Sequence, residues 1–238
     1  MRIGVFSDIH ANWQALEAVL EDSEADIEAG LCLGDVVGYG GDPVKCVDEV
    51  MRRGWPSLIG NHDRACTDRR ILDWFNDDAA QVIRWTTEAL GSERLKWLES
   101  LPESADRDGV LLVHASPRDP IFEYILDAAT AAANLELLHG GACLHGHTHV
   151  PGYFYLDGDS IQHNYWLGRV RVTGPALINP GSVGQPRDGN PDASYAVWDT
   201  DEASLEWRRV PYDREAAKRA ILKANLPERF ATRLDVGR

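Results

Sequence analysis

Five short segments of the chain combine metal-binding side chains with glycine or a tight turn. They are Asp8-Ile9-His10, Gly34-Asp35, Gly60-Asn61-His62-Asp63, His114 and Gly146-His147-Thr148-His149. With Asp63 set aside, they offer two carboxylates, one amide oxygen and five imidazoles as ligands, whereas one tetrahedral ion needs about four. Two ions that share a water molecule activate it as a nucleophile. The sequence therefore predicts a hydrolase with two divalent metal ions.

The spacing within these segments indicates how the ions would be shared. Asp8 and His10 lie two residues apart and can face one ion, while Asp35, after flexible Gly34, can bridge two. His147 and His149 would point in different directions from one extended segment. In two-metal sites, separations of about 3.5–4 Å let both ions share one water. The predicted ligand sets are Asp8, His10, Asp35 and His149 for one ion, and Asp35, Asn61, His114 and His147 for the other.

His62 is left over from both ligand sets, and Asp63 beside it could hold its imidazole in one tautomer. An imidazole with a pKa near neutrality can donate a proton to a leaving alkoxide, which contributes about 10²–10⁴-fold to a rate. The sequence predicts an attack of metal-bound hydroxide on phosphorus, with His62 as the general acid and Asp63 as its partner.

Two further residues are candidates for contact with a phosphate. Asn12 is as good a candidate for the cap of a helix that begins near Trp13 as for a phosphate contact. Arg187 lies in a loop and could bind a phosphate through two hydrogen bonds, with a solvated surface position as the alternative. Both alternatives stay open from the sequence.

Nearly every candidate ligand stands directly after a short apolar run. The runs are Ile3 to Phe6, Leu31 to Leu33, Leu58-Ile59, Val110 to Val113 and Ala142 to Leu144, and Leu177-Ile178 precedes Asn179 in the same way. Continuous apolar runs are typical of strands buried on both faces. Ligands at the carboxyl ends of such strands would meet at one edge of an α/β sheet.

Helical periodicity separates these runs. It covers Trp13 to Leu20, Pro43 to Met51, Phe75 to Leu90, Leu95 to Leu101, Asp127 to Leu138 and Arg214 to Lys223. After Pro151 the sequence changes to short runs separated by turn signals, which predict antiparallel strands. No division before Pro151 leaves the ligands together, so we expect one domain over residues 1–238 with two sheets.

Charge and composition exclude several classes of partner. The net charge of the 238 residues is −14, and non-specific binding to nucleic acid depends on basic patches, so duplex nucleic acid is not an expected partner. Two bound dications would still attract a small phosphorylated substrate. No apolar run is long enough to cross a bilayer and no basic leader precedes Ile3, which predicts a cytoplasmic protein without a membrane partner. The four cysteines form no CxxC pair and are expected to be buried free thiols.

In this order, the five segments resemble the signature of the calcineurin-like metallophosphoesterases: D-x-H, G-D, G-N-H-D/E, an isolated H and G-H-x-H. The resemblance covers residues 1 to about 185 and includes Asn179-Pro180-Gly181-Ser182, which is similar to the N-P-G-S segment of a small bacterial branch with YfcE-like phosphodiesterases. It implies a four-layer α/β/β/α sandwich with two mixed β-sheets and a binuclear centre of manganese, iron or zinc. The ligand and acid roles given above follow this family residue by residue.

The predicted activity is that of a phosphodiesterase acting on a small phosphodiester or nucleotide. One alternative is a phosphomonoesterase, either a protein phosphatase or a dinucleoside polyphosphate hydrolase. Another is an interaction scaffold of the same fold without catalysis, against which the presence of His62 speaks. The sequence does not indicate the oligomeric state.

Overall fold

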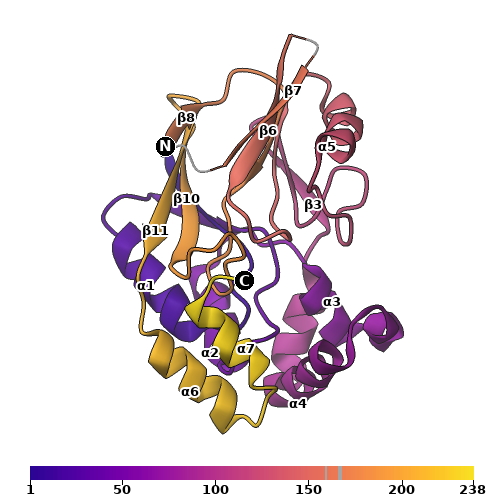
Figure 1. Cartoon of the computed structure of the whole chain (residues 1–238), viewed down its shortest axis with the longest axis vertical. Coiled ribbons are helices and arrows are strands. Elements are labelled where there is room, and N and C mark those ends of the chain that lie inside the picture. Colours follow the sequence, from indigo (N-terminus) through magenta and orange to yellow (C-terminus); the bar gives the residue numbers. More distant parts are fainter. Residues whose placement is uncertain (159, 166–167) are drawn as a thin grey trace.

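The computed structural model describes residues 1–158, 160–165 and 168–238. Two β-sheets with helices on their outer sides form its centre (Figure 1). In the described residues the first sheet has five strands, in the spatial order β2 (Ala29–Cys32), β1 (Arg2–Phe6), β10 (Ala193–Asp199), β11 (Ser204–Val210) and β8 (Arg169–Arg171). This sheet is mixed, because β1 runs parallel to β2 and antiparallel to β10.

The second sheet is mixed as well. Among the described residues its strands follow the order β3 (Ser104–Arg107), β4 (Val110–Val113), β5 (Ala142–Leu144), β9 (Ala176–Asn179), β6 (Gly152–Asp157) and β7 (Ser160–Tyr165). The central strands β4, β5 and β9 are parallel, while the outer pairs are antiparallel. Parallel strands place their carboxyl ends at one edge, where ligands of open sheets collect.

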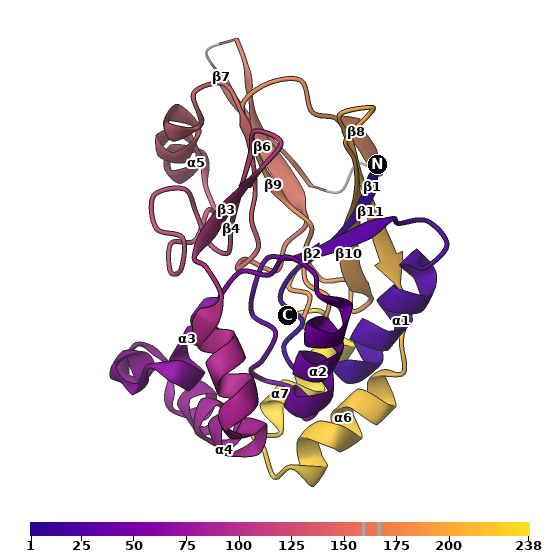
Figure 2. The same ribbon diagram turned by 180° about the vertical axis from the view of Figure 1, so that it is seen from behind.

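Helices cover both outer faces, and Figures 1 and 2 show α5 alone against the second sheet. The helices are α1 (Trp13–Ser23), α2 (Pro43–Arg53), α3 (Asn61–Thr67), α4 (Asp77–Ser100), α5 (Ala128–Leu135), α6 (Arg214–Lys223) and α7 (Arg229–Thr232), with 3-10 turns at Arg69–Trp74, Glu136–Leu138 and Arg233–Asp235. One apolar cluster joins α1, α2 and α4 to the first sheet, a second lies between the sheets, and another joins α5 to the second sheet. The predicted sandwich with two mixed sheets is confirmed.

Alternation along β1 explains how one strand serves two layers. Ile3 and Val5 point into the cluster between the sheets, and Phe6 points to the helical layer, where its ring stacks on Trp55. Both faces of the strand are therefore buried, which is why the sequence shows a continuous apolar run.

Several local predictions are confirmed and some are wrong. The predicted helices all form, and the two expected between residues 75 and 101 are confirmed: they share the label α4 but are separated at Gly91, whose φ of 70° is not helical. Leu58-Ile59 forms no strand, since only an isolated bridge at Ser57 pairs there. Strands β3 and β7 are polar on alternate positions; β7 lies in the region where antiparallel strands were predicted, whereas β3 was not expected.

All four cysteines are buried and free, as predicted. In the described part of the chain, no helix combines the length and hydrophobicity that a bilayer crossing requires.

Candidate metal centre

The seven predicted metal ligands gather where strands of both sheets end. Asp8 and His10 follow β1, Asp35 follows β2, His114 follows β4, His147 and His149 follow β5, and Asn61 begins α3. All seven side chains are buried. The structure thus brings together ligands from loops that are up to 141 residues apart, between Asp8 and His149.

Five of these residues have the left-handed backbone that usually favours glycine. They are Asp8, His10, Asp35, His147 and His149, with φ between 49° and 65°. Such conformations cost about 1–3 kcal/mol each and persist where the surrounding structure requires them, often at functional sites. Here the tight turns direct the side chains of these five residues toward the same buried region.

The first group of donor atoms comprises Asp8, His10, His149 and Asp35. The Nε2 atoms of His10 and His149 lie 3.0 Å apart. Asp8 Oδ1 lies 3.3 Å from His149 Nε2 and 3.9 Å from His10 Nε2. Asp35 Oδ2 lies 3.6 Å from His10 Nε2. Asp8 Oδ1 is buried without a hydrogen-bond partner, so it is free to bind a cation.

The second group is built around His114. Its Nε2 lies 3.2 Å from Asn61 Oδ1 and 3.2 Å from His147 Nδ1. Asp35 Oδ2, which also borders the first group, lies 3.5 Å from His114 Nε2. The carboxylate of Asp35 is therefore placed between the two groups, where a bridging ligand would have to be.

Main-chain carbonyls orient the four imidazoles. His10, His114 and His149 each hold Nδ1 against a carbonyl, of Val37 at 3.0 Å, Leu33 at 3.0 Å and Gln185 at 2.6 Å, whereas His147 holds Nε2 against that of Phe122 at 3.2 Å. A carbonyl only accepts, so these nitrogens carry the protons and the opposite nitrogens carry lone pairs. Such contacts are the usual means of orienting metal-bound histidine.

The facing lone pairs fit a bound cation. Two bare nitrogens at 3.0 Å, as in His10 and His149, repel each other unless a positive charge lies between them. Two nitrogen ligands about 2.1 Å from one ion and at right angles would lie about 3.0 Å apart. The donor set of oxygens and imidazoles thus suits divalent ions such as manganese, iron or zinc.

The charges of the ligand residues are poorly balanced among themselves. Burial lowers the pKa of His10 well below its usual value, and the nearby His149 adds to this effect. Burial also raises the pKa of Asp35 well above its usual value, as do the carboxylates of Asp63 and Asp8. Burial would raise the pKa of Asp8 too, but the adjacent His149 holds it below its usual range. Cations would relieve the repulsion among carboxylates.

The predicted role of Asp63 is wrong. Its Oδ2 accepts from the main-chain N–H groups of Gly60 at 3.1 Å and Val36 at 3.3 Å, and its Oδ1 accepts from that of Val37 at 3.1 Å. Both oxygens are therefore occupied, and Nδ1 of His62 is buried without a hydrogen-bond partner. Asp63 caps α3 and ties it to the loop after β2, because neighbouring residues at a helix start point in different directions.

His62 itself faces the centre. Its ring lies 4.9 Å from that of His10, edge to face, and it can share a coordination space with His10 and Asp35. Burial lowers the pKa of His62 well below its usual value, followed by the positive charge of Arg187. The imidazole is therefore neutral near pH 7 in the absence of a substrate.

Asn12 is the cap of α1. Its Oδ1 accepts from the N–H of Ala15 at 3.2 Å, and its Nδ2 donates to the carbonyl of Gly184 at 2.8 Å and to the hydroxyl of Tyr212 at 3.2 Å. These hydrogen bonds engage both ends of the amide. Of the two alternatives for Asn12, the structure favours the cap over the phosphate contact.

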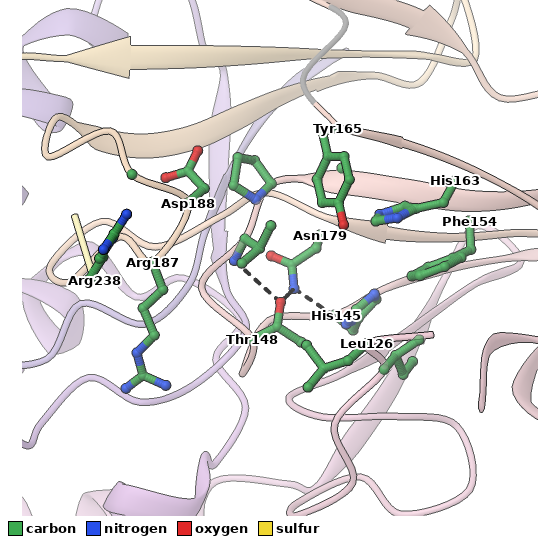
Figure 3. Close-up of a pocket in the computed structure, with 15 residues that line it drawn as sticks. Leu126, His145, Thr148, Phe154, His163, Tyr165, Asn179, Arg187, Asp188 and Arg238 are labelled. Atoms are coloured by element: carbon green, nitrogen blue, oxygen red, sulfur yellow. Dashed lines mark hydrogen bonds between the residues drawn. The ribbon is translucent and has the colours of Figure 1, made fainter. Parts of the chain in front are cut away.

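Arg187 reaches the centre from a neighbouring cavity. A cavity of about 510 Å³ lies behind the 147–149 segment, with Thr148 on its wall and Asn179 hydrogen-bonded to Thr148 at 3.0 Å. Figure 3 shows the stem of Arg187 at the border of this cavity, with its guanidinium directed away from the other lining residues. That guanidinium lies 5.7 Å above the ring of Tyr39, beside His10 and His62.

Two aromatic residues outside the predicted set of site residues also border the centre. Tyr124 packs its ring 3.8 Å from that of His147, and the ring of Tyr39 lies 4.4 Å from that of His62. Tyr39 carried a signal, since a tyrosine between Gly38 and Gly40 is unusual in a tight turn. Tyr124 carried none that separates it from an ordinary surface aromatic.

The comparisons with known proteins agree with this geometry. Residues 1–203 match the model of the calcineurin-like phosphoesterase superfamily domain. The chain belongs to this family. The predictions of a phosphoester hydrolase and of this fold are thereby confirmed, and the buried groups of histidine and aspartate are compatible with its dependence on divalent metal.

Several relatives match over the full length. The crystal structure of a metallophosphoesterase from Sphaerobacter thermophilus is 40% identical, with a TM-score of 0.87 over 100% of this chain and 99% of that one. An uncharacterized protein from Methanocaldococcus jannaschii is 39% identical over 99% of this chain and 98% of its own. A hypothetical protein from Pyrococcus horikoshii OT3, at 21% identity and a TM-score of 0.81 over 100% of this chain and 98% of its own, shares the fold.

Proposed function

We propose that this metal-dependent phosphoester hydrolase is a phosphodiesterase for small phosphodiesters or nucleotides and that it uses two divalent ions. The observation that carries the proposal is the position of Asp35 Oδ2, 3.6 Å from His10 Nε2 and 3.5 Å from His114 Nε2. One carboxylate oxygen borders two separate sets of oriented nitrogen donors, which is the arrangement that a bridged pair of ions requires.

In this proposal the ligand sets are those predicted from the sequence. Asp8, His10, Asp35 and His149 would hold one ion, and Asp35, Asn61, His114 and His147 the other. When bound, the ions would supply Lewis acidity toward phosphate oxygens and lower the pKa of water. The hydrogen bonds of the imidazoles to main-chain carbonyls keep the donor atoms in place before the ions arrive.

His62 is the proposed general acid. Its pKa is low in the free protein because of burial and Arg187, but a bound phosphate would bring negative charge that favours the protonated ring. Arg187, whose guanidinium lies over Tyr39, is the proposed phosphate contact. A small substrate is favoured by the burial of the ligands and by the net charge of −14, which disfavours long polyanions.

The activity is tested with protein loaded with manganese or zinc. We expect bis(p-nitrophenyl) phosphate to be hydrolysed faster than p-nitrophenyl phosphate or diadenosine tetraphosphate. Faster hydrolysis of the monoester or of the polyphosphate would support the phosphomonoesterase alternative instead. If none is hydrolysed and His62→Ala changes nothing, the interaction scaffold is the better description.

Metal content provides an independent test of the roles. Asp35→Ala should lose both ions, because it removes an oxygen that borders both donor sets, whereas His62→Ala should keep them. Elemental analysis of the purified variants measures this directly. Equal metal loss in the two variants would contradict the assignment.

A further inference from the structure

Tyr39 occupies a strained position that its surroundings fix. Its φ is 57°, in the left-handed region that aromatic residues rarely adopt. A Cβ at Gly38 would lie 2.5 Å from His62 Nδ1, and a Cβ at Gly40 would lie 2.4 Å from the carbonyl oxygen of His10. The loop is therefore packed directly against two histidines of the centre. Strain that persists in such a place indicates a requirement for this side chain.

The ring of Tyr39 connects the metal centre to a groove. It lies 4.6 Å from the ring of His10 and 4.4 Å from that of His62. On its other side it contacts Phe230 of α7 at 4.9 Å and lines a groove of about 640 Å³ together with Arg229 and Arg233. Figure 1 shows the C-terminal segment returning to the middle of the molecule, and α7 packs against α6 there.

Two arginines lie near Tyr39: Arg187 contacts it, and Arg233 lines the same groove. Arg187 Nη2 donates to the hydroxyl of Tyr39 at 3.4 Å, and Arg187 Nε is buried without a hydrogen-bond partner. Burial lowers the pKa of Arg233, and the nearby positive charge of Arg187 lowers it further. In the part of the chain that the structure describes, neither arginine forms an ion pair with a carboxylate side chain. Two such cations next to each other would be stabilised by an anion between them.

Arg229 differs from these two although it lines the same groove. It pairs with Asp78 at 2.7 Å and stacks over the ring of Phe230 at 5.0 Å. Arg233 donates through Nε to an oxygen of the carboxyl group of Arg238, and among the described residues its two Nη groups are left for a ligand. Guanidinium groups bind phosphate oxygens through paired hydrogen bonds, and a tyrosine hydroxyl adds a further donor.

We propose that Tyr39 and Arg233 form a second anion subsite beside the metal centre, which binds a phosphoryl group next to the one that is hydrolysed, and that Arg187 lies between the two and contacts both. The inference rests on the proposed phosphoester hydrolysis and narrows its substrate class to nucleotide-like esters with a further phosphoryl group. Arg233 is then a specificity-determining residue. It lies in the C-terminal segment beyond residue 203, where the match to the family model ends.

Binding is tested first without metal, so that the result does not depend on catalysis. Inorganic pyrophosphate should raise the melting temperature of chelator-treated wild-type protein and of Arg229→Ala, but not of Arg233→Ala or Arg233→Gln. Succinate serves as a dianion without phosphate and should have a smaller effect. Circular dichroism confirms that each variant is folded, and Arg233→Gln retains a polar side chain in case the alanine variant is unstable.

Inhibition then tests the subsite in the manganese-loaded protein, with bis(p-nitrophenyl) phosphate as substrate. For each variant, the inhibition constant of orthophosphate is divided by that of pyrophosphate. This ratio should fall about tenfold in Arg233→Ala, because pyrophosphate loses a charged hydrogen bond and inhibits more weakly. Tyr39→Phe, which keeps the ring, should lower the ratio less. In Arg229→Ala the ratio should equal that of the wild type. Pyrophosphate also chelates manganese, but this affects all variants alike and does not change the comparison between them.

The two proposals fail in different ways. If the wild type hydrolyses none of the substrates, the proposed function fails, while the pyrophosphate shift of the metal-free protein still decides the subsite. If Arg233→Ala and Arg229→Ala behave alike in both experiments, or if succinate stabilises as well as pyrophosphate, the subsite is overturned.

Discussion

Replacement of Gly60 by alanine tests the metal centre with a single methyl group. Gly60 has φ −93° and ψ 175°, which alanine adopts without strain, so any effect must come from the added atom. A Cβ there would lie 2.1 Å from Asp35 Oδ1 and 2.4 Å from Asp35 N. Carbon atoms normally approach other heavy atoms to about 3.5 Å, so Asp35 would have to move by about 1 Å.

The expected loss of activity follows from the position of Asp35 between the two ligand sets. Its Oδ2 lies 3.6 Å from His10 Nε2 and 3.5 Å from His114 Nε2, so one displacement disturbs both ligand sets. A misplacement of about 1 Å in an active site costs on the order of 10²-fold in rate. Overpacking of a buried site also costs about 1–3 kcal/mol of stability. We therefore expect about a hundredfold loss of phosphodiester hydrolysis together with reduced metal content.

The assay compares Gly60→Ala with Gly174→Ala, whose added Cβ would have no atom within 4 Å. Hydrolysis of bis(p-nitrophenyl) phosphate at saturating manganese, metal per chain by elemental analysis and the melting temperature are measured for both. Gly174→Ala should match the wild type. If Gly60→Ala equals Gly174→Ala in activity and metal content, the geometry around Asp35 has been interpreted incorrectly.

Three further predictions concern the support of the site. Asn12→Ala should lose about 1 kcal/mol of stability because the cap of α1 is removed, yet keep its metal, as melting and elemental analysis would show; unchanged stability would refute the cap. Asp63→Asn should lose about 1–3 kcal/mol, since an amide group would face the N–H groups of Gly60 and Val37; an unfolding free energy equal to that of the wild type would argue against this clamp. In metal-free protein, burial lowers the pKa of His145 and of His149 to about 4, so the unfolded chain binds more protons below about pH 6.5. Stability should therefore fall as the pH drops from about 6.5 to about 4, by on the order of 3 kcal/mol for each histidine, and a flat profile of melting temperature over this range would contradict it.

Much of the fold was visible in the sequence because burial leaves periodic traces. The runs before Asp8 and His114 are strands buried on both faces, and the capped or proline-led periodic stretches are helices. The polar strands β3 and β7 left no such trace, because each lies at an edge of the second sheet with alternate residues exposed. Whether a strand with exposed residues forms depends on its pairing with a neighbouring strand rather than on its own sequence pattern.

The chemistry of the site was likewise determined at the level of residue types. Aspartate, asparagine and histidine in the five short segments specify hard oxygen and imidazole donors wherever the chain places them. Their pairing was decided in three dimensions, where Asp35 came to lie between His10 and His114. Asp63 shows what residue types alone cannot determine. Its position next to His62 suggested a contact, but at the start of α3 the two side chains point in different directions.

Other features of the centre had no sequence signal. The carbonyls of Val37, Leu33, Gln185 and Phe122 orient the imidazoles, but every residue carries a carbonyl, so only the folded backbone selects which ones face a ring. Arg233 and Tyr39 line one groove because α7, which precedes Arg233, packs against α6. Side-chain types determine which bonds are possible, and tertiary packing determines the distances that make them.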